Sequence, residues 1–173
     1  MAEREIEVLI SEEKIKKRVD ELARRIEDDY ARGELVVVGV LKGSFIFMSD
    51  LVRLIKRPLA CDFIRVSSYK DDQSTGVVRM EFDMTQPIEG KDVLLIEDIV
   101  DTGRTLRYLL RHLKSKNPSS LKVASLLYKD MGTGSREMID YLGFEVPDRY
   151  VIGYGLDSKG LHRSLPYVGA YVE

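Results

Sequence analysis

The sequence has 173 residues but only one cysteine, five prolines and no tryptophan. The single cysteine, Cys61, excludes an internal disulfide and suits a reducing compartment. The first ten residues, MAEREIEVLI, contain no long apolar run, so we expect no signal peptide. The longest apolar stretches are far shorter than the roughly 20 residues that cross a membrane as a helix. We therefore expect a cytoplasmic protein with no membrane partner.

The sequence also lacks an excess of positive charge. It has 27 lysines and arginines against 29 aspartates and glutamates, which gives a net charge of −2. A general nucleic-acid binder usually carries a basic excess, so we expect no nucleic-acid partner. Two distant histidines and Cys61 do not have the spacing of a zinc site. We expect Cys61 in the core at the start of a strand, and His112 exposed on a charged helix.

Hydrophobic periodicity predicts an α/β fold. Apolar residues recur at helical spacing over residues 12–31, where Ser11 can cap the first turn. Short apolar or alternating runs predict strands at residues 35–41, 61–69, 77–84, 92–100, 122–129 and 150–156. Helical patterns between them predict two further helices, at residues 42–56 and 102–116. Strands that alternate with helices indicate a parallel sheet. The length fits one domain over residues 1–173.

The residues most informative about chemistry follow the predicted strand 92–100. Glu97, Asp98 and Asp101 precede a Thr/Gly-rich turn that opens a helix. Backbone N–H groups at a helix start bind anions, and the hydroxyls of Thr102 and Thr105 add donors. Two carboxylates can bind sugar hydroxyls or hydrated Mg²⁺, and the third can move a proton. The alternative is an ordinary capped turn with solvent-facing acids. The sequence has neither a P-loop nor a dinucleotide-binding fingerprint.

Residues 93–106, VLLIEDIVDTGRTL, resemble the phosphoribosyl-pyrophosphate-binding motif of type I phosphoribosyltransferases. Further segments resemble the hypoxanthine-guanine branch, in the right order and over nearly the whole chain: they are residues 40–51, 67–76, 88–103, 143–157 and 165–169. The resemblance implies a central, mainly parallel sheet flanked by helices, with a small hood formed by the N- and C-terminal segments. It also implies a homodimer or homotetramer.

The resemblance implies a reaction and a cofactor. The expected reaction joins hypoxanthine or guanine, through N9, to phosphoribosyl pyrophosphate with Mg²⁺, and releases pyrophosphate. Asp101 would move the proton at N7 of the base. Glu97 and Asp98 would bind the ribose hydroxyls and Mg²⁺, and Asp157 would be a ligand of a second Mg²⁺ ion. The residues implied for the 5′-phosphate are Thr102, Gly103, Arg104 and Thr105.

The same resemblance implies further roles for residues outside this motif. The pyrophosphate would be held by Leu41, Lys42, Gly43 and Arg163, and in this family the Leu–Lys peptide can be cis. Ser68 and Tyr69 would begin a loop that closes over the site. Lys129 would donate to O6 of the base, Tyr150 would stack on it, and the backbone of Val151 would contact its edge. Taken singly, these residues also have ordinary interpretations as core or surface side chains.

Residues 130–136 depart from the family pattern, which puts details of the base pocket in doubt. Gly132 and Gly134 could form a second phosphate loop, but the spacing favours a flexible loop. Three rival functions stay open. They are a nucleic-acid-binding regulator that keeps the fold without turnover, a phosphoribosyltransferase for uracil or adenine, and a magnesium phosphohydrolase.

Overall fold

A computed structural model describes residues 5–30, 32–68 and 78–172 of the chain. Its larger sheet has six strands in the order β4-β3-β2-β5-β6-β7. In that order they are Val78–Phe82, Leu59–Ser68, Leu35–Leu41, Asp92–Val100, Ser120–Tyr128 and Tyr141–Glu145. All neighbouring pairs are parallel except β3 with β4. The predicted α/β class and mainly parallel sheet are confirmed.

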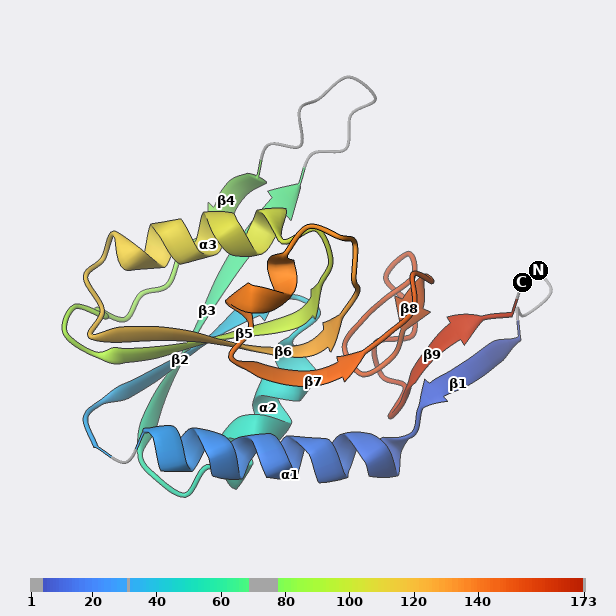
Figure 1. Ribbon diagram of the computed structural model, residues 1–173, viewed down its shortest axis with the longest axis horizontal. Coiled ribbons are helices and arrows are strands. Elements are labelled where there is room, and N and C mark those ends of the chain that lie inside the picture. The colour runs from blue at the N-terminus through green and yellow to red at the C-terminus, as the bar shows by residue number, and fades with distance from the viewer. Residues whose placement is uncertain (1–4, 31, 69–77, 173) are drawn as a thin grey trace.

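Helices cover both faces of this sheet, which explains why its central strands are apolar throughout. Helices α1 (Glu12–Asp29) and α2 (Phe45–Leu54) lie on one face, and α3 (Arg104–Lys114) lies on the other (Figure 1). Alternate residues of a strand point to opposite faces. Accordingly, Leu94 and Ile96 of β5 belong to the core under α1 and α2, whereas Val93 and Leu95 belong to the core under α3.

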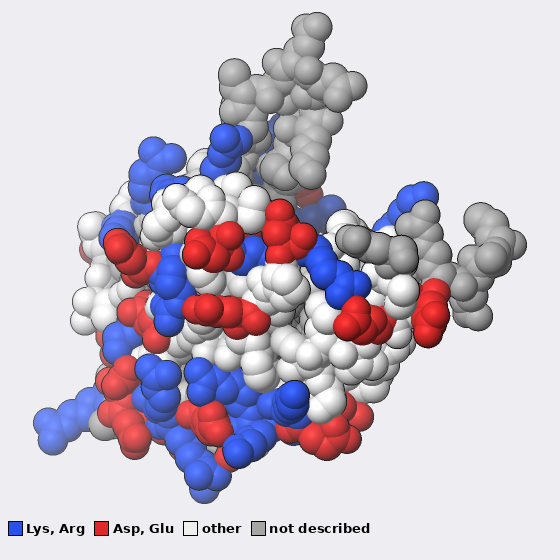
Figure 2. Space-filling model, turned by 45° about the vertical axis from the view of Figure 1, so that its right-hand side comes forward, with Lys and Arg blue, Asp and Glu red and all other residues white. Residues whose placement is uncertain are grey.

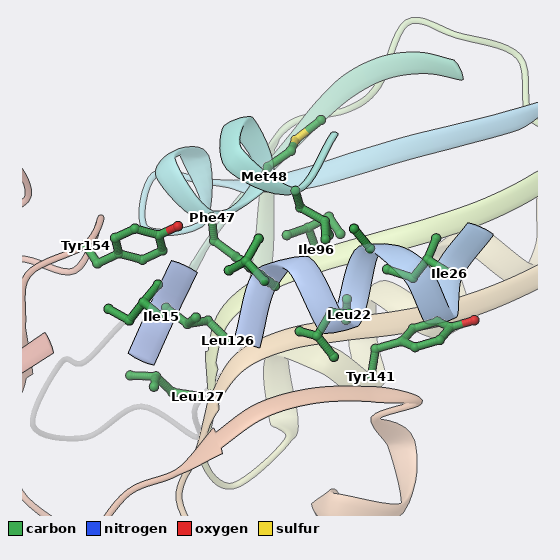
Figure 3. Close-up of a cluster of buried hydrophobic side chains, with 14 of the residues drawn as sticks. Ile15, Leu22, Ile26, Phe47, Met48, Ile96, Leu126, Leu127, Tyr141 and Tyr154 are labelled. Atoms are coloured by element: carbon green, nitrogen blue, oxygen red, sulfur yellow. The ribbon is translucent and has the colours of Figure 1, made fainter. Parts of the chain in front are cut away.

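Helix α1 shows how the sequence specifies one of these layers. The side chain of Ser11 accepts a hydrogen bond from the Lys14 N–H, as a helix cap does. Ile15, Leu22 and Ile26 are almost fully buried and point from α1 toward the sheet and α2 (Figure 3). The predicted helix and its buried stripe are therefore confirmed.

A second, smaller sheet joins the two ends of the chain. Its antiparallel strands run in the order β1 (Ile6–Ile10), β9 (Val168–Tyr171) and β8 (Val151–Ile152). It lies beside the large sheet, near the two termini (Figure 1). Its connection to α2 includes a hydrogen bond of 2.6 Å from the Tyr154 hydroxyl to Asp50 Oδ2. This sheet corresponds to the expected hood.

The structure corrects several expectations. The predicted strand 150–156 ends at Ile152, because Gly153, Tyr154 and Gly155 all have positive φ angles that turn the chain. Cys61 is exposed, since it alternates along β3 with the buried Asp62. His112 is half-buried, and its Nε2 lies 2.9 Å from an oxygen of Asp83.

Some elements were not predicted at all. These are strands β1, β7 and β9 and a short 3-10 helix, η1 (Ser135–Met138), at the end of the loop that departs from the family pattern.

Among the residues that the structure describes, no helix combines the length and apolar character needed to span a bilayer.

Candidate active site

The predicted acids lie around a cavity at the carboxyl ends of the central strands. The cavity has a volume of about 230 Å³, and its polar lining comes from Glu97, Asp98, Asp101, Gly103 and Thr105. Its apolar lining comes from Val40, Val66, Ile99, Val100 and Leu106. In open parallel sheets, ligands bind beyond the carboxyl ends of the strands, and this cavity has that position.

Two carboxyl groups in the cavity are held in an unfavourable environment. Glu97 is only 4% exposed, and burial together with the nearby Asp98 and Asp101 raises its pKa well above the usual value. Burial also raises the pKa of Asp98 to about 6, although the Ile99 N–H and the cation of Arg163 oppose this shift. Both groups would gain from a nearby cation or from hydroxyl donors, because either favours the charged form.

The turn after the acids forms the start of α3. Gly103 is the capping residue, with φ of 72°, and the helix begins at Arg104. The first N–H groups of a helix have no partner within it, so the turn presents donors to an anion. Asp101 is exposed, and its carboxylate accepts a hydrogen bond from the Thr102 N–H. Residues 101–105, predicted to bind the 5′-phosphate and named the phosphate cradle, thus include the start of α3 and a Thr102 N–H that already has an acceptor.

The loop after β2 lies against the acids. The Leu41–Lys42 peptide is cis, and the hydroxyl of the buried Ser44 donates to the Val40 carbonyl at 2.7 Å. A Cβ atom on Gly43 would lie 1.5 Å from Asp98 Oδ2, so no larger residue fits this contact. A Cβ atom on Gly155 would likewise lie 2.0 Å from the Gly43 carbonyl oxygen. The two glycines let the loop, the acid pair and the hood meet.

A network in the hood is centred on Asp157. Its Oδ1 lies 2.5 Å from Arg163 Nη2, and its Oδ2 accepts a hydrogen bond of 2.6 Å from the Gly160 N–H. Arg163 also donates to the Gly155 carbonyl at 2.6 Å. The Tyr150 hydroxyl donates to the Asp157 carbonyl at 2.7 Å, while the residue is 61% exposed. The predicted base-stacking ring and pyrophosphate arginine are therefore connected through Asp157.

Lys129 directly follows β6 and lies beside the end of β5. Its N–H donates to the Val100 carbonyl at 2.9 Å. Its Nζ lies 3.7 Å from Asp148 Oδ1, and only 15% of its side chain is exposed. Val151 is buried in β8. The Lys129 side chain is therefore mostly buried, with the carboxylate of Asp148 as its acidic neighbour.

Other predicted residues lie at the edge of the site or beyond the described ranges. Lys42 and Arg104 are exposed, and Thr102 is half-buried. Ser68 is the last residue of β3, and the rest of the predicted closing loop, from Tyr69 to residue 76, lies outside the residues that the structure describes.

Sequence reasoning assigned no role to four residues that shape this site. Gly155 and Ser44 fix the loop after β2, and Ser135 and Arg107 contact the phosphate cradle. The paired glycines at 153 and 155 were a usable signal for a tight turn. Ser135 and Arg107 gave none, because a lone serine and a helix-surface arginine are ordinary in any sequence.

Comparison with known proteins gives concordant matches. The profile of the "Phosphoribosyl transferase domain" family matches residues 7–159. The hypoxanthine-guanine phosphoribosyltransferase of Dictyostelium discoideum is 48% identical over 172 residues, which cover 96% of each chain. The crystal structure of a hypoxanthine phosphoribosyltransferase from Staphylococcus aureus is similar with a TM-score of 0.89 and 43% identity, over 96% of this chain and 91% of that one. A Trypanosoma cruzi enzyme complexed with the product IMP has a TM-score of 0.85 and 39% identity, over 99% and 93% of the two chains.

Proposed function

The chain belongs to the phosphoribosyl transferase family, and we propose that it transfers the phosphoribosyl group of phosphoribosyl pyrophosphate to N9 of hypoxanthine or guanine. The products are IMP or GMP and pyrophosphate. The observation that carries this proposal is the cavity in which three acids adjoin the start of helix α3. Relatives that share over 40% of their residues across nearly the whole chain carry the corresponding name.

The reaction displaces pyrophosphate at C1 of the ribose. Residues 101–105 hold the 5′-phosphate through the helix-start N–H groups and the hydroxyls of Thr102 and Thr105. Glu97 and Asp98 accept hydrogen bonds from the ribose hydroxyls. Asp101, exposed at the edge of the cavity, takes the proton of the base as the bond to N9 forms. These groups act by orientation and charge stabilisation, and the mechanism needs no protein nucleophile.

The acid pair fits a hydrated Mg²⁺. This ion usually takes one or two carboxylates together with substrate phosphates and water. Within the described ranges, no group of three or more His, Cys, Asp or Glu side chains gathers to hold a metal, which leaves the substrate to provide the remaining ligands. The raised pKa of Asp98 reflects a buried charge without enough compensation, and a cation there would lower it. Glu97 and Asp98 would hold the ion, with Asp157 for a second one, and Mg²⁺ would neutralise charge on the pyrophosphate.

On the pyrophosphate side, Leu41, Lys42, Gly43 and Arg163 are the expected ligands. Arg163 is paired with Asp157. Binding of pyrophosphate would give the guanidinium a second acidic partner, and a bidentate arginine suits phosphate oxygens. The exchange would leave Asp157 free to approach a metal ion.

At the base, Lys129 would donate to the exocyclic O6. An amino group at the same position would also be a donor and would face the ammonium without a hydrogen bond, so adenine is disfavoured. The exposed ring of Tyr150 would stack on the purine, and the backbone of Val151 would contact its edge. Ser68 and Tyr69 would begin the loop that excludes water during the reaction.

The regulator alternative is less well supported. A protein that binds nucleic acid through this fold would need a basic surface. Acidic and basic side chains are interspersed over the face shown in Figure 2. A regulator without turnover would also not need the acid cluster, yet Glu97, Asp98 and Asp101 all line one cavity.

The test is spectrophotometric turnover with phosphoribosyl pyrophosphate and Mg²⁺, offering hypoxanthine, guanine, xanthine, adenine and uracil in parallel. We expect nucleotide from hypoxanthine or guanine, with pyrophosphate as the second product. Turnover only with adenine or uracil would contradict the role of Lys129 while leaving the family intact. Release of orthophosphate would favour a phosphohydrolase, and salt-dependent nucleic-acid binding without turnover would favour the regulator.

We further propose that the chain works in the cytoplasm as a homodimer or homotetramer. Closed symmetric oligomers are the usual state of soluble enzymes of this kind. Sedimentation of the purified protein at several concentrations would separate these two states from a monomer.

A further inference from the structure

The segment that departs from the family pattern, residues 130–136, contacts the phosphate cradle. Ser135, at the start of η1, is fully buried. A Cβ atom on Gly103 would lie 2.6 Å from both Ser135 Cβ and Met138 Cε, so η1 is packed directly against the turn that begins α3. The segment therefore packs against the cradle at Gly103, and neither Ser135 nor Met138 is among the residues that line the cavity.

Two side chains hold the backbone of the cradle in place. The Ser135 hydroxyl donates to the Asp101 carbonyl at 2.6 Å. Arg107 donates to the Thr102 carbonyl at 2.9 Å and to the Thr133 carbonyl at 3.1 Å, which ties α3 to the same segment. The Thr133 hydroxyl in turn donates to Ser135 Oγ at 3.1 Å. Two successive carbonyl groups of the cradle, those of Asp101 and Thr102, thus accept hydrogen bonds from side chains outside it.

These partners also fix the direction of the N–H groups. In a planar trans peptide, the C=O and N–H bonds point in opposite directions. Holding the Asp101 carbonyl toward Ser135 therefore directs the Thr102 N–H the other way, where it now meets the Asp101 carboxylate. Holding the Thr102 carbonyl toward Arg107 similarly directs the Gly103 N–H away from Arg107. Rotation of either peptide would turn a carbonyl oxygen toward the phosphate and repel it.

We propose that Ser135 and Arg107 are positioning residues that pre-orient the cradle for the 5′-phosphate of substrate and nucleotide product. The proposal rests on the proposed function, because it assumes that residues 101–105 bind this phosphate. It predicts that affinity for a 5′-phosphate depends on two residues outside the cavity lining.

The first test compares two ligands that would bind at different subsites, by calorimetry in the presence of Mg²⁺. IMP places a phosphate in the cradle, whereas pyrophosphate would bind at the loop after β2 and Arg163. In Ser135→Ala we expect IMP to bind roughly tenfold more weakly, which is the usual effect of losing one hydrogen bond to a buried group. We expect pyrophosphate affinity to stay within about twofold of the wild type, because its subsite keeps all of its contacts.

Arg107→Met provides a second variant that does not depend on a buried position. Arg107 is exposed, so its replacement has little effect on folding, and we expect IMP affinity to fall roughly fivefold. Arg111→Met, one turn further along α3 and also exposed, is the matched control. Ser120→Ala is the control for the serine, since it loses a hydrogen bond of 2.6 Å to Asp92 at the opposite end of the sheet. Neither control should change IMP affinity.

The outcomes separate the inference from the function on which it rests. Selective loss of IMP affinity in both variants supports the positioning role. Unchanged IMP binding in Arg107→Met and Ser135→Ala overturns it, and so does an equal loss for IMP and pyrophosphate, which indicates general destabilisation. If Ser135→Ala does not fold, Arg107→Met decides. A wild-type protein with no turnover and no IMP binding refutes the proposed function, whereas wild-type binding with unaffected variants refutes the inference alone.

Discussion

Strands β5 and β6 carry charged side chains at both of their ends, and the two ends differ in how these charges are compensated. At the amino ends, Lys122 Nζ lies 2.8 Å from Asp29 and within 5.5 Å of the ring centres of Tyr30 and Tyr141. At the carboxyl ends, Glu97 is buried and the adjacent Asp98 is half-buried, and Lys129 Nζ lies 3.7 Å from Asp148 Oδ1. The charges at the amino ends are closely paired, whereas the acids at the carboxyl ends lie next to each other in a cavity.

The pKa values show the same contrast. Hydrogen bonds from Lys122 and Tyr141 lower the pKa of Asp29. Burial raises the pKa of Glu97 and Asp98, and neighbouring carboxylates add to the shift of each. Paired charges contribute to stability, whereas unpaired buried charges reduce it and are typical of functional sites. The contrast supports the proposal that substrate binds at the carboxyl ends of the strands.

The largest expected effect comes from replacing the proton acceptor. In Asp101→Asn we expect kcat to fall by about 10²–10⁴-fold, the usual contribution of a general base, with little change in stability because the side chain is exposed. Asp29→Asn, at the other end of the sheet, should keep the wild-type kcat. Steady-state turnover with hypoxanthine measures both, and similar rates for the two variants would contradict the assignment of Asp101.

The next prediction compares two lysines: Lys122 lies within β6, and Lys129 directly follows it. Lys129→Met should lower kcat/KM for hypoxanthine about 10–100-fold, because a charged hydrogen bond to O6 is lost. It should lower adenine turnover much less, so the preference for 6-oxopurines weakens. Lys122→Met removes the cation near Tyr30 and Tyr141 and should affect only the unfolding midpoint. Equal losses with both bases would indicate that Lys129 has a structural role.

A third effect concerns stability at the substrate-binding end. The pKa of Asp98 rises from 3.8 to about 6 on folding, so the folded state prefers the protonated form. Its favourable contribution is present below about pH 4 and is lost as the pH rises through 6. Asp98→Asn should therefore stabilise the ligand-free protein by about 1–3 kcal/mol at pH 8 and by much less at pH 4. Urea unfolding at both pH values measures this, and destabilisation at pH 8 would contradict the interpretation.

The smallest effect concerns the paired end. The pKa of Asp29 is lowered on folding, so its contribution is present above the unfolded value of 3.8 and is lost as the pH falls through the lower folded value. Asp29→Asn should cost less than about 1 kcal/mol at pH 7, since both partners are more than a third exposed and solvent screens the pair. The loss should shrink in high salt, which thermal unfolding at two salt concentrations can test. A loss that does not change with salt would indicate that packing dominates.

The sequence by itself determined five of the six strands of the large sheet, all except β7, and the location of the acids. The predicted strands 35–41 and 92–100 agree with β2 and β5 to the residue, because uninterrupted apolar runs are a local signal of strands buried on both faces. The acids follow directly in the sequence, so their place at the carboxyl end of β5 needed no further information. The family resemblance extended this to the activity, which comparison with relatives supports.

Only the tertiary structure decided how the surrounding parts meet. The contacts of Gly43 with Asp98 and Gly155, the pairing of Asp157 with Arg163, and the contact of Ser135 with the cradle are not visible in any local pattern. Each of these contacts forms between parts of the chain that come together only when the hood and η1 are in place. Apolar periodicity specifies which face of an element is buried. The neighbour that covers that face, and the backbone groups that come within hydrogen-bonding distance, are fixed by packing of the whole chain.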